Sequence, residues 1–104
     1  MYTLILITAK DVEEAERIAG HLVGLKLAAC ANIVSDVSSV FWWQGRLDKA
    51  RETLIFLKTC EEKFNDIVAA VKTIHSYSCP EIIALPILAG SNEYLGWIKE
   101  VLDG

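Results

Sequence analysis

The sequence has no run of lysine or arginine, and its 10 basic residues are outnumbered by 14 acidic ones, which gives a formal net charge of −4. Proteins that bind nucleic acid usually carry a basic patch or stripe, because phosphate contacts dominate their affinity. Attraction to an anionic membrane surface also depends on clustered basic side chains. We therefore expect neither nucleic acid nor a membrane among the partners of this protein.

Long apolar runs and a leader sequence are missing too. No apolar stretch approaches the ~20 residues that a membrane-spanning helix needs. The apolar segment at residues 2–8 lacks the basic region and the small-residue cleavage site of a signal peptide. The three cysteines form no C-x-x-C pair, which favours free thiols in a reducing compartment. These features predict a cytoplasmic protein.

The sequence also lacks a recognisable catalytic motif. It has no Walker motif, and no Ser-His-Asp or Cys-His arrangement can be assembled from it. An acylphosphatase needs a phosphate-binding loop with an arginine after the first strand, but residues 8–11 read TAKD. An RNA-binding domain of similar architecture would carry basic charge beside its aromatic strands. We expect a protein that is not an enzyme, with no catalytic residue and no obligatory cofactor.

Apolar residues, in contrast, are abundant and make up 53% of the 104 positions. A chain of this length fits a single domain, here residues 1–104. A small domain has a large surface relative to its volume, so one copy does not hide all of this apolar area. We expect part of it to contact other subunits.

The order of apolar patterns predicts an α+β fold of the ferredoxin-like, split βαβ type. Short continuous apolar runs, typical of buried strands, alternate with segments of helical periodicity. The expected order is strand, helix, strand, strand, helix, strand and an extra C-terminal helix, with an antiparallel sheet and helices on one face. The strands are expected at residues 2–8, 28–43, 46–58 and 82–88, with a bulge near residues 35–39.

Capping residues predict where the helices begin. Asp11 with Glu14, and Thr59 with Glu62, both have the three-residue spacing of a capping box. The last helix is expected to start at residues 90–92. The charged side chains of the first helix are expected to form a solvated face: Glu13, Glu14, Glu16 and Arg17.

The two central strands are predicted to form a long hairpin over roughly residues 28–58, turning at Gln44 and Gly45. Strands usually run about 3–10 residues, so this hairpin should project beyond its sheet and expose an apolar edge. Trp42 and Trp43 point to opposite faces of one strand. We expect one to pack inward and the other to lie at a subunit contact, because aromatic residues are enriched at interfaces.

One short loop concentrates side chains that are able to bind a metal: His75, Cys79 and Glu81. Imidazole and carboxylate suit Cu(II) or Zn(II), and a thiolate adds a soft donor. In the alternative interpretation, His75 caps the C-terminus of the preceding helix, Glu81 pairs with a cation, and Cys79 is a small buried apolar residue. A second possible site is a cleft between subunits that holds a small ligand and is lined by Lys58, Tyr77 and Trp43.

Several segments together resemble the CutA divalent-cation-tolerance family. The longest reads HSYSCPEIIALPI and is similar to the family pattern H-P-Y-x-x-P-E-I-[IL]-A-L-P-I. Two departures are that Ser76 stands where the family usually has proline, and that Ile7 stands where some members carry a cysteine proposed as a copper ligand. The other matching segments are LAACANI at 27–33, FWWQGRL at 41–47, LKT at 57–59 and YLGWI at 94–98.

This resemblance implies a cytoplasmic, ferredoxin-like homotrimer packed through its long hairpins. It also implies a role in tolerance of divalent cations, copper above all, with His75 and Glu81 at positions associated with metal or ligand binding. PII-type signalling trimers share this architecture. The alternative function is therefore a signal-transduction trimer that binds a small molecule in the clefts between subunits.

Overall fold

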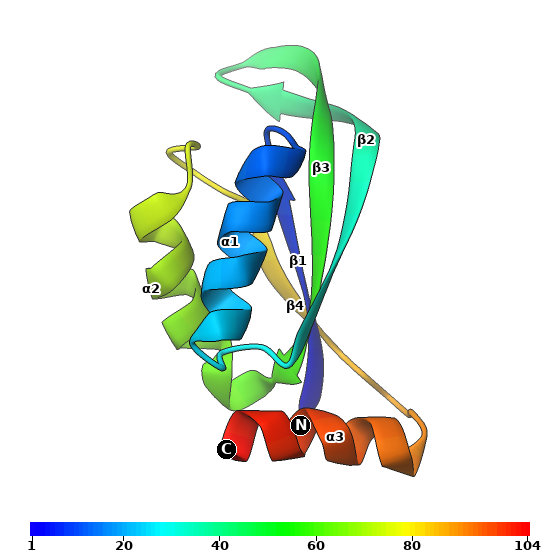
Figure 1. Ribbon diagram of the computed structural model, residues 1–104. Helices are drawn as coiled ribbons and strands as arrows, with labels where there is room; N and C mark the ends of the chain where they lie inside the picture. The colour runs from blue at the N-terminus through cyan, green and yellow to red at the C-terminus, as the bar shows by residue number, and fades with distance from the viewer.

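Four antiparallel strands form one open sheet in the order β2-β3-β1-β4 in the computed structural model, which describes residues 1–104 (Figure 1). This order confirms the expected ferredoxin-like α+β fold. Helices α1 and α2 cover one face of the sheet, and α3 crosses its end beside the N-terminus (Figure 1). The elements are β1 (Tyr2–Ala9), α1 (Val12–Gly24), β2 (Cys30–Trp43), β3 (Arg46–Cys60), the 3-10 helix η1 (Glu61–Lys63), α2 (Phe64–Ile74), β4 (Ile82–Pro86) and α3 (Asn92–Asp103).

The main core lies between the sheet and helices α1 and α2. Odd-numbered residues of β1 and β3 point toward these helices, because side chains alternate along a strand. On the helices, apolar residues at helical spacing supply the other half of the core. The fully buried members of this core include Ile5, Ile7, Ile18, Leu22, Ile55, Leu57, Ile67 and Val71.

Two of the three predicted helix starts are confirmed. The Asp11 carboxylate accepts the N–H of Glu14 at 2.8 Å, and the Ser91 hydroxyl oxygen accepts the N–H of Tyr94 at 3.3 Å. The third prediction, that Thr59 caps a helix, is wrong.

Thr59 remains in β3, where it is fully buried and its hydroxyl donates to the carbonyl of Leu27 at 2.6 Å. Pairing with β1 continues to the last residue of β3, Cys60, so the chain is still extended at Thr59. The helix α2 begins only after η1, and its start has no capping side chain.

The predicted long hairpin is confirmed. Strands β2 and β3 pair from Cys30 opposite Lys58 to the turn, but β1 accompanies β3 only over residues 53–60. The half of the hairpin beyond this point curves away from the sheet without a further strand beside it (Figure 1). The predicted bulge is confirmed by a register shift between Val34 and Val37, with Asp36 at a φ of 63°.

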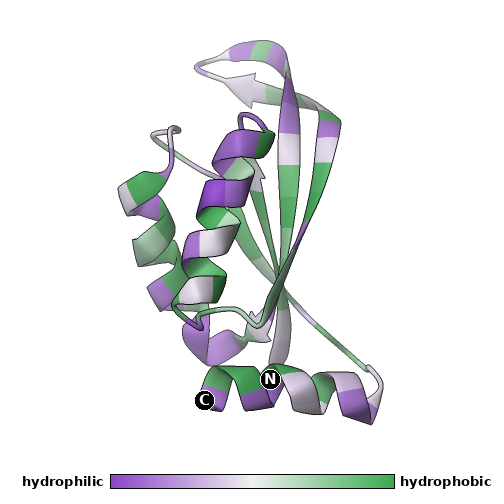
Figure 2. Cartoon of the chain, viewed as in Figure 1, coloured by the Kyte–Doolittle hydropathy of each residue, from purple (hydrophilic) through white to green (hydrophobic).

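The sheet face opposite α1 and α2 is apolar, and much of it is exposed. Even-numbered residues of β1 and β3 point to this face and lie beside residues of the neighbouring strands, such as Leu6 between Phe56 on β3 and Ile83 on β4. Val34, Ile83 and Leu85 are exposed by 46%, 48% and 41%. Figure 2 shows continuous hydrophobic colour through the middle of the sheet, because both faces of these strands carry apolar side chains. An exposed apolar face of this kind is unusual for a single folded chain in water.

Candidate functional site

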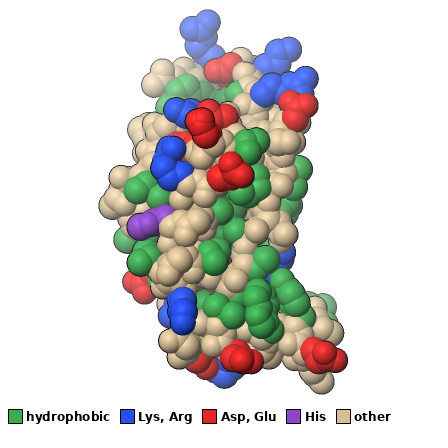
Figure 3. All heavy atoms as spheres, viewed as in Figure 1, with side chains coloured by type: hydrophobic (Ala, Val, Ile, Leu, Met, Phe, Trp, Pro, Cys, Tyr) green, Lys and Arg blue, Asp and Glu red, His purple; other side chains and the backbone are tan.

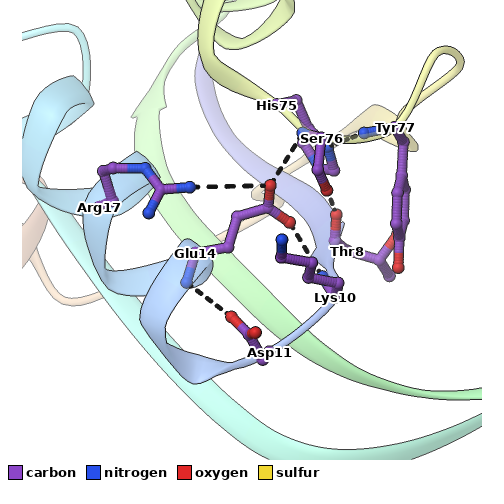
Figure 4. Close-up of polar contacts among 8 residues, drawn as sticks. All are labelled: Thr8, Lys10, Asp11, Glu14, Arg17, His75, Ser76 and Tyr77. Carbon is purple, nitrogen blue, oxygen red and sulfur yellow. Dashed lines mark hydrogen bonds and ion pairs between the residues drawn. The ribbon is translucent and has the colours of Figure 1, made fainter.

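A buried carboxylate, Glu14, ties the start of α1 to the loop that follows α2 (Figure 4). Its side chain is fully buried, although the sequence pattern led us to expect a solvated one. One carboxylate oxygen accepts the N–H of Lys10 at 3.0 Å, and the other accepts the N–H of Ser76 at 2.8 Å. The guanidinium of Arg17 lies 3.9 Å away on the solvent side. Glu14 therefore fixes the position where the 76–81 loop leaves α2.

The pKa of Glu14 is lowered from its ordinary value of 4.5. Burial opposes this shift, because it penalises the charged form. The N–H donors of Lys10 and Ser76 outweigh burial, since both bond the ionised carboxylate. Glu14 is therefore charged at neutral pH and contributes a fixed negative charge beneath the loop.

The His75 ring uses both of its nitrogens inside its own chain. Nδ1 accepts the N–H of Tyr77 at 3.0 Å, so Nε2 carries the proton and donates it to the carbonyl of Thr8 at 2.7 Å. The rings of His75 and Tyr77 also pack at a centroid distance of 4.8 Å. His75 is the C-cap residue of α2 by position, but its ring bonds to Thr8 and Tyr77 and to no carbonyl of the helix. Its observed contacts hold Tyr77 in place.

Replacing His75 with glutamine tests this positioning role. We expect the fold to persist while the amide hydrogen of Tyr77 exchanges about tenfold faster, because its hydrogen bond to the ring is lost. The measurement is hydrogen exchange resolved to single residues. The matched control is His21→Gln, on the exposed side of α1. Unchanged exchange at Tyr77 in His75→Gln would show that the ring does not hold the loop.

Between the projecting half of the hairpin and the 77–81 loop lies a pocket of about 790 Å³. Strands β2 and β3 form one wall and the loop forms the other. The Tyr77 hydroxyl donates to a carboxylate oxygen of Glu52 at 2.7 Å and so links the two walls. Burial, reinforced by this hydrogen bond, raises the pKa of Tyr77. The lining residues are Thr8, Ser39, Val40, Phe41, Trp43, Asp48, Ala50, Glu52, Tyr77, Ser78, Cys79, Pro80 and Glu81.

Four of the six residues expected at a site line this one pocket: Trp43, Tyr77, Cys79 and Glu81. His75 lies directly behind Tyr77. Lys58, which we expected in the ligand cleft, does not line it.

Lys58 lies opposite Cys30, at the end of the hairpin farthest from the turn, where its ammonium group donates to the side chain of Asn32. The pocket is therefore lined by acidic and aromatic residues, without the lysine that would have suited a small anion.

Sequence reasoning missed two kinds of residue here. Asp48 and Glu52 were not identified, because their place in the pocket depends on how far the hairpin curves. Glu14 was misread as solvated, although a signal was present: it lies four residues before Ile18 and eight before Leu22, on the apolar stripe of α1.

The residues of one chain do not fit a metal ion. No three His, Cys, Asp or Glu side chains are gathered closely enough to hold one. As a ligand, His75 would have to give up one of its two hydrogen bonds. The Cys79 thiol is free and its residue is exposed. Cys79 and Glu81 share a pocket wall, but this chain brings no further ligands to them, as a stable site would need.

Comparison with known sequences shows which family combines this fold with this loop sequence. Residues 3–101 match the family described as CutA1 divalent ion tolerance protein. The chain belongs to this family. The Archaeoglobus fulgidus divalent-cation tolerance protein CutA is 47% identical over 103 residues, which cover 99% of this chain and 100% of the relative. The Thermus thermophilus CutA protein is 43% identical, and the aligned residues cover 96% of this chain and 97% of the relative.

Solved CutA structures have the same fold. The structure of the Archaeoglobus fulgidus protein superimposes with a TM-score of 0.94 and covers 98% of this chain and 99% of its own. The CutA1 structure from Oryza sativa gives 0.93 at 39% identity, covering 96% and 92%. The resemblance seen in the sequence is thus confirmed, and so is the ferredoxin-like fold. CutA proteins are named for cation tolerance, and no catalytic activity is indicated for them.

Proposed function

We propose that this protein is a homotrimer that acts in divalent-cation tolerance, copper above all, and binds metal at sites shared between its subunits. The main observation in support of a trimer is the apolar sheet face opposite α1 and α2. Membership of the CutA family supports the cation role. Because no three candidate ligands gather within one chain, the proposed site takes ligands from more than one subunit.

The hairpin supplies a second surface for assembly. Its projecting half exposes large apolar side chains, among them Val40 at 67%, Trp42 at 73% and Leu47 at 66%. In the space-filling view, hydrophobic side chains also reach the surface above α3 (Figure 3). Surfaces of this kind are costly in water and are typical of subunit contacts. None of the helices combines the length and apolar character that a membrane span requires.

Cys79 and Glu81 are the proposed contributors to the metal site, with the remaining ligands from a neighbouring subunit. Burial and the nearby Glu52 charge raise the pKa of Glu81. A bound cation would reverse this shift, since it stabilises the carboxylate. His75 supports the site by holding Tyr77, and becomes a ligand only if one of its ring hydrogen bonds is released.

Replacing Glu81 with glutamine tests the metal proposal. We expect Cu(II) to bind the trimer about tenfold or more weakly, because one charged ligand is removed while the shape is kept. Equilibrium dialysis against a competing chelator measures the affinity. The matched control, Glu100→Gln, neutralises an exposed carboxylate on α3. Equal affinities in the two variants would remove Glu81 from the site.

A second candidate function is small-molecule binding of the PII type, and the pocket beside the hairpin favours it. Its volume of about 790 Å³ falls in the range of about 300–1,000 Å³ that is typical of small-molecule sites.

We also propose a cytoplasmic location, which the three free cysteines favour. The solved Archaeoglobus relative is described as periplasmic. Cell fractionation decides between the two compartments.

A further inference from the structure

The pocket beside the hairpin carries three carboxylates and no basic side chain. Asp48, Glu52 and Glu81 line it, whereas no lysine, arginine or histidine does. None of the three takes part in an ion pair within the chain. The guanidinium of Arg51, which lies beside Glu52 in the sequence, is paired with Asp36 at 2.9 Å. Glu52 accepts from the Tyr77 hydroxyl and Asp48 accepts from the N–H of Lys49, but no cationic side chain pairs with the three carboxylates.

The spacing of these carboxylates differs from that of a metal site. Asp48 and Glu52 lie on the same face of β3, four residues apart, which places their backbones about 13 Å from each other. Glu81 approaches from the opposite wall, at the start of β4. No three acidic, His or Cys side chains converge as ligands of a single ion require. An elongated molecule with more than one positive group fits this arrangement better.

Aromatic residues line the pocket together with the carboxylates, and Phe41 lies directly opposite Asp48 in the hairpin. Phe41 and Trp43 come from β2, and Tyr77 comes from the opposite loop. Such rings attract ammonium groups through their faces and pack against the methylene groups between them. The Tyr77 hydroxyl is already bonded to Glu52, so that ring is held as a fixed wall. Hydrated inorganic ions gain little from walls of this kind.

We infer that this pocket binds an elongated organic cation, an aliphatic di- or polyamine. Its amino groups pair with Glu52, Glu81 and Asp48, and its methylene chain lies against Trp43 and Tyr77. The inference rests on the pocket being a small-molecule site, the second candidate function above, and it names the class of ligand. It shares Glu81 with the proposed copper site, so spermidine binding is measured on the metal-stripped protein and separately from copper binding.

Calorimetric titration of the metal-stripped protein with spermidine tests the inference. At fixed ionic strength we expect saturable binding at least about tenfold tighter than that of butylamine or of magnesium chloride. The double variant Glu52→Gln with Glu81→Gln should weaken spermidine binding by about tenfold or more. It preserves the shape of both side chains and an acceptor for the Tyr77 hydroxyl.

The matched control is Glu16→Gln with Glu100→Gln, which removes the same charge from exposed positions on α1 and α3. This control should bind spermidine as the unchanged protein does. Equal weakening in both double variants would overturn the inference, since it would reveal diffuse attraction to an acidic protein. Absence of saturable binding would overturn it as well. Neither result tests the trimer, which is measured by the mass of the assembly. Neither tests copper binding, which is measured by equilibrium dialysis.

Discussion

Replacing Phe56 with aspartate is expected to dissociate the proposed trimer into folded monomers. Phe56 lies in the middle of the sheet face opposite α1 and α2, between Leu6 on β1 and Asn32 on β2. In the single chain Phe56 is half-buried, so the fold of the monomer should tolerate a polar side chain at this position. In the trimer, each copy would bury a carboxylate without a partner. The association constant should fall by a factor on the order of a thousand or more.

Light scattering after size exclusion measures this change, and thermal unfolding at several protein concentrations complements it. Assembly contributes to apparent stability by mass action, so the melting temperature of the unchanged protein should rise with concentration. That dependence should vanish in Phe56→Asp. Ala69→Asp, on the exposed side of α2, is the matched control and should remain trimeric. A trimer that survives Phe56→Asp would exclude this face as the interface.

Replacing Glu14 with alanine should lower the free energy of unfolding by about 3 kcal/mol, because the N–H groups of Lys10 and Ser76 lose their acceptor and the buried carboxylate is removed. The attachment of the 76–81 loop to α1 is lost with them. Chemical denaturation measures the change, and Glu13→Ala on the exposed face of the same helix turn is the control. A loss in Glu14→Ala no larger than in the control would show that the network contributes nothing to stability.

The same residue predicts a dependence of stability on pH. Because the folded pKa of Glu14 lies below its ordinary value of 4.5, the folded state binds fewer protons than the unfolded state in this range. Its contribution is fully present above pH 4.5 and is lost as the pH falls through the folded pKa. Glu14→Gln should therefore flatten the acid side of the stability curve. An unchanged slope in this variant would contradict the assignment.

The fold was predictable because local patterns and long-range pairing agree in this chain. The apolar run in residues 2–8, the helical stripe ending at Leu22, and the turn at Gln44 and Gly45 each specify one element. The turn residues have φ values of 50° and 77°, as a tight hairpin requires. Thr59 was mispredicted because pairing with β1 keeps the chain extended where the local pattern favours a cap.

The candidate site was only partly predictable. The loop carrying Tyr77, Cys79 and Glu81 is continuous in sequence, so its grouping was visible. The opposite wall comes from Asp48 and Glu52, which join the loop only because the hairpin curves beyond the sheet. Curvature of that kind depends on a bulge and on strand twist rather than on residue pattern.

Native mass spectrometry of the metal-stripped protein, titrated with Cu(II) and then with Zn(II), tests the central claim most directly. It reports the number of chains and the number of bound ions in one spectrum. A trimer that takes up a fixed number of ions, one per subunit or one per trimer, at low micromolar metal is the predicted result. A monomer, or a trimer that gains ions only gradually and without a fixed number, would contradict the claim of a trimer with metal sites shared between subunits.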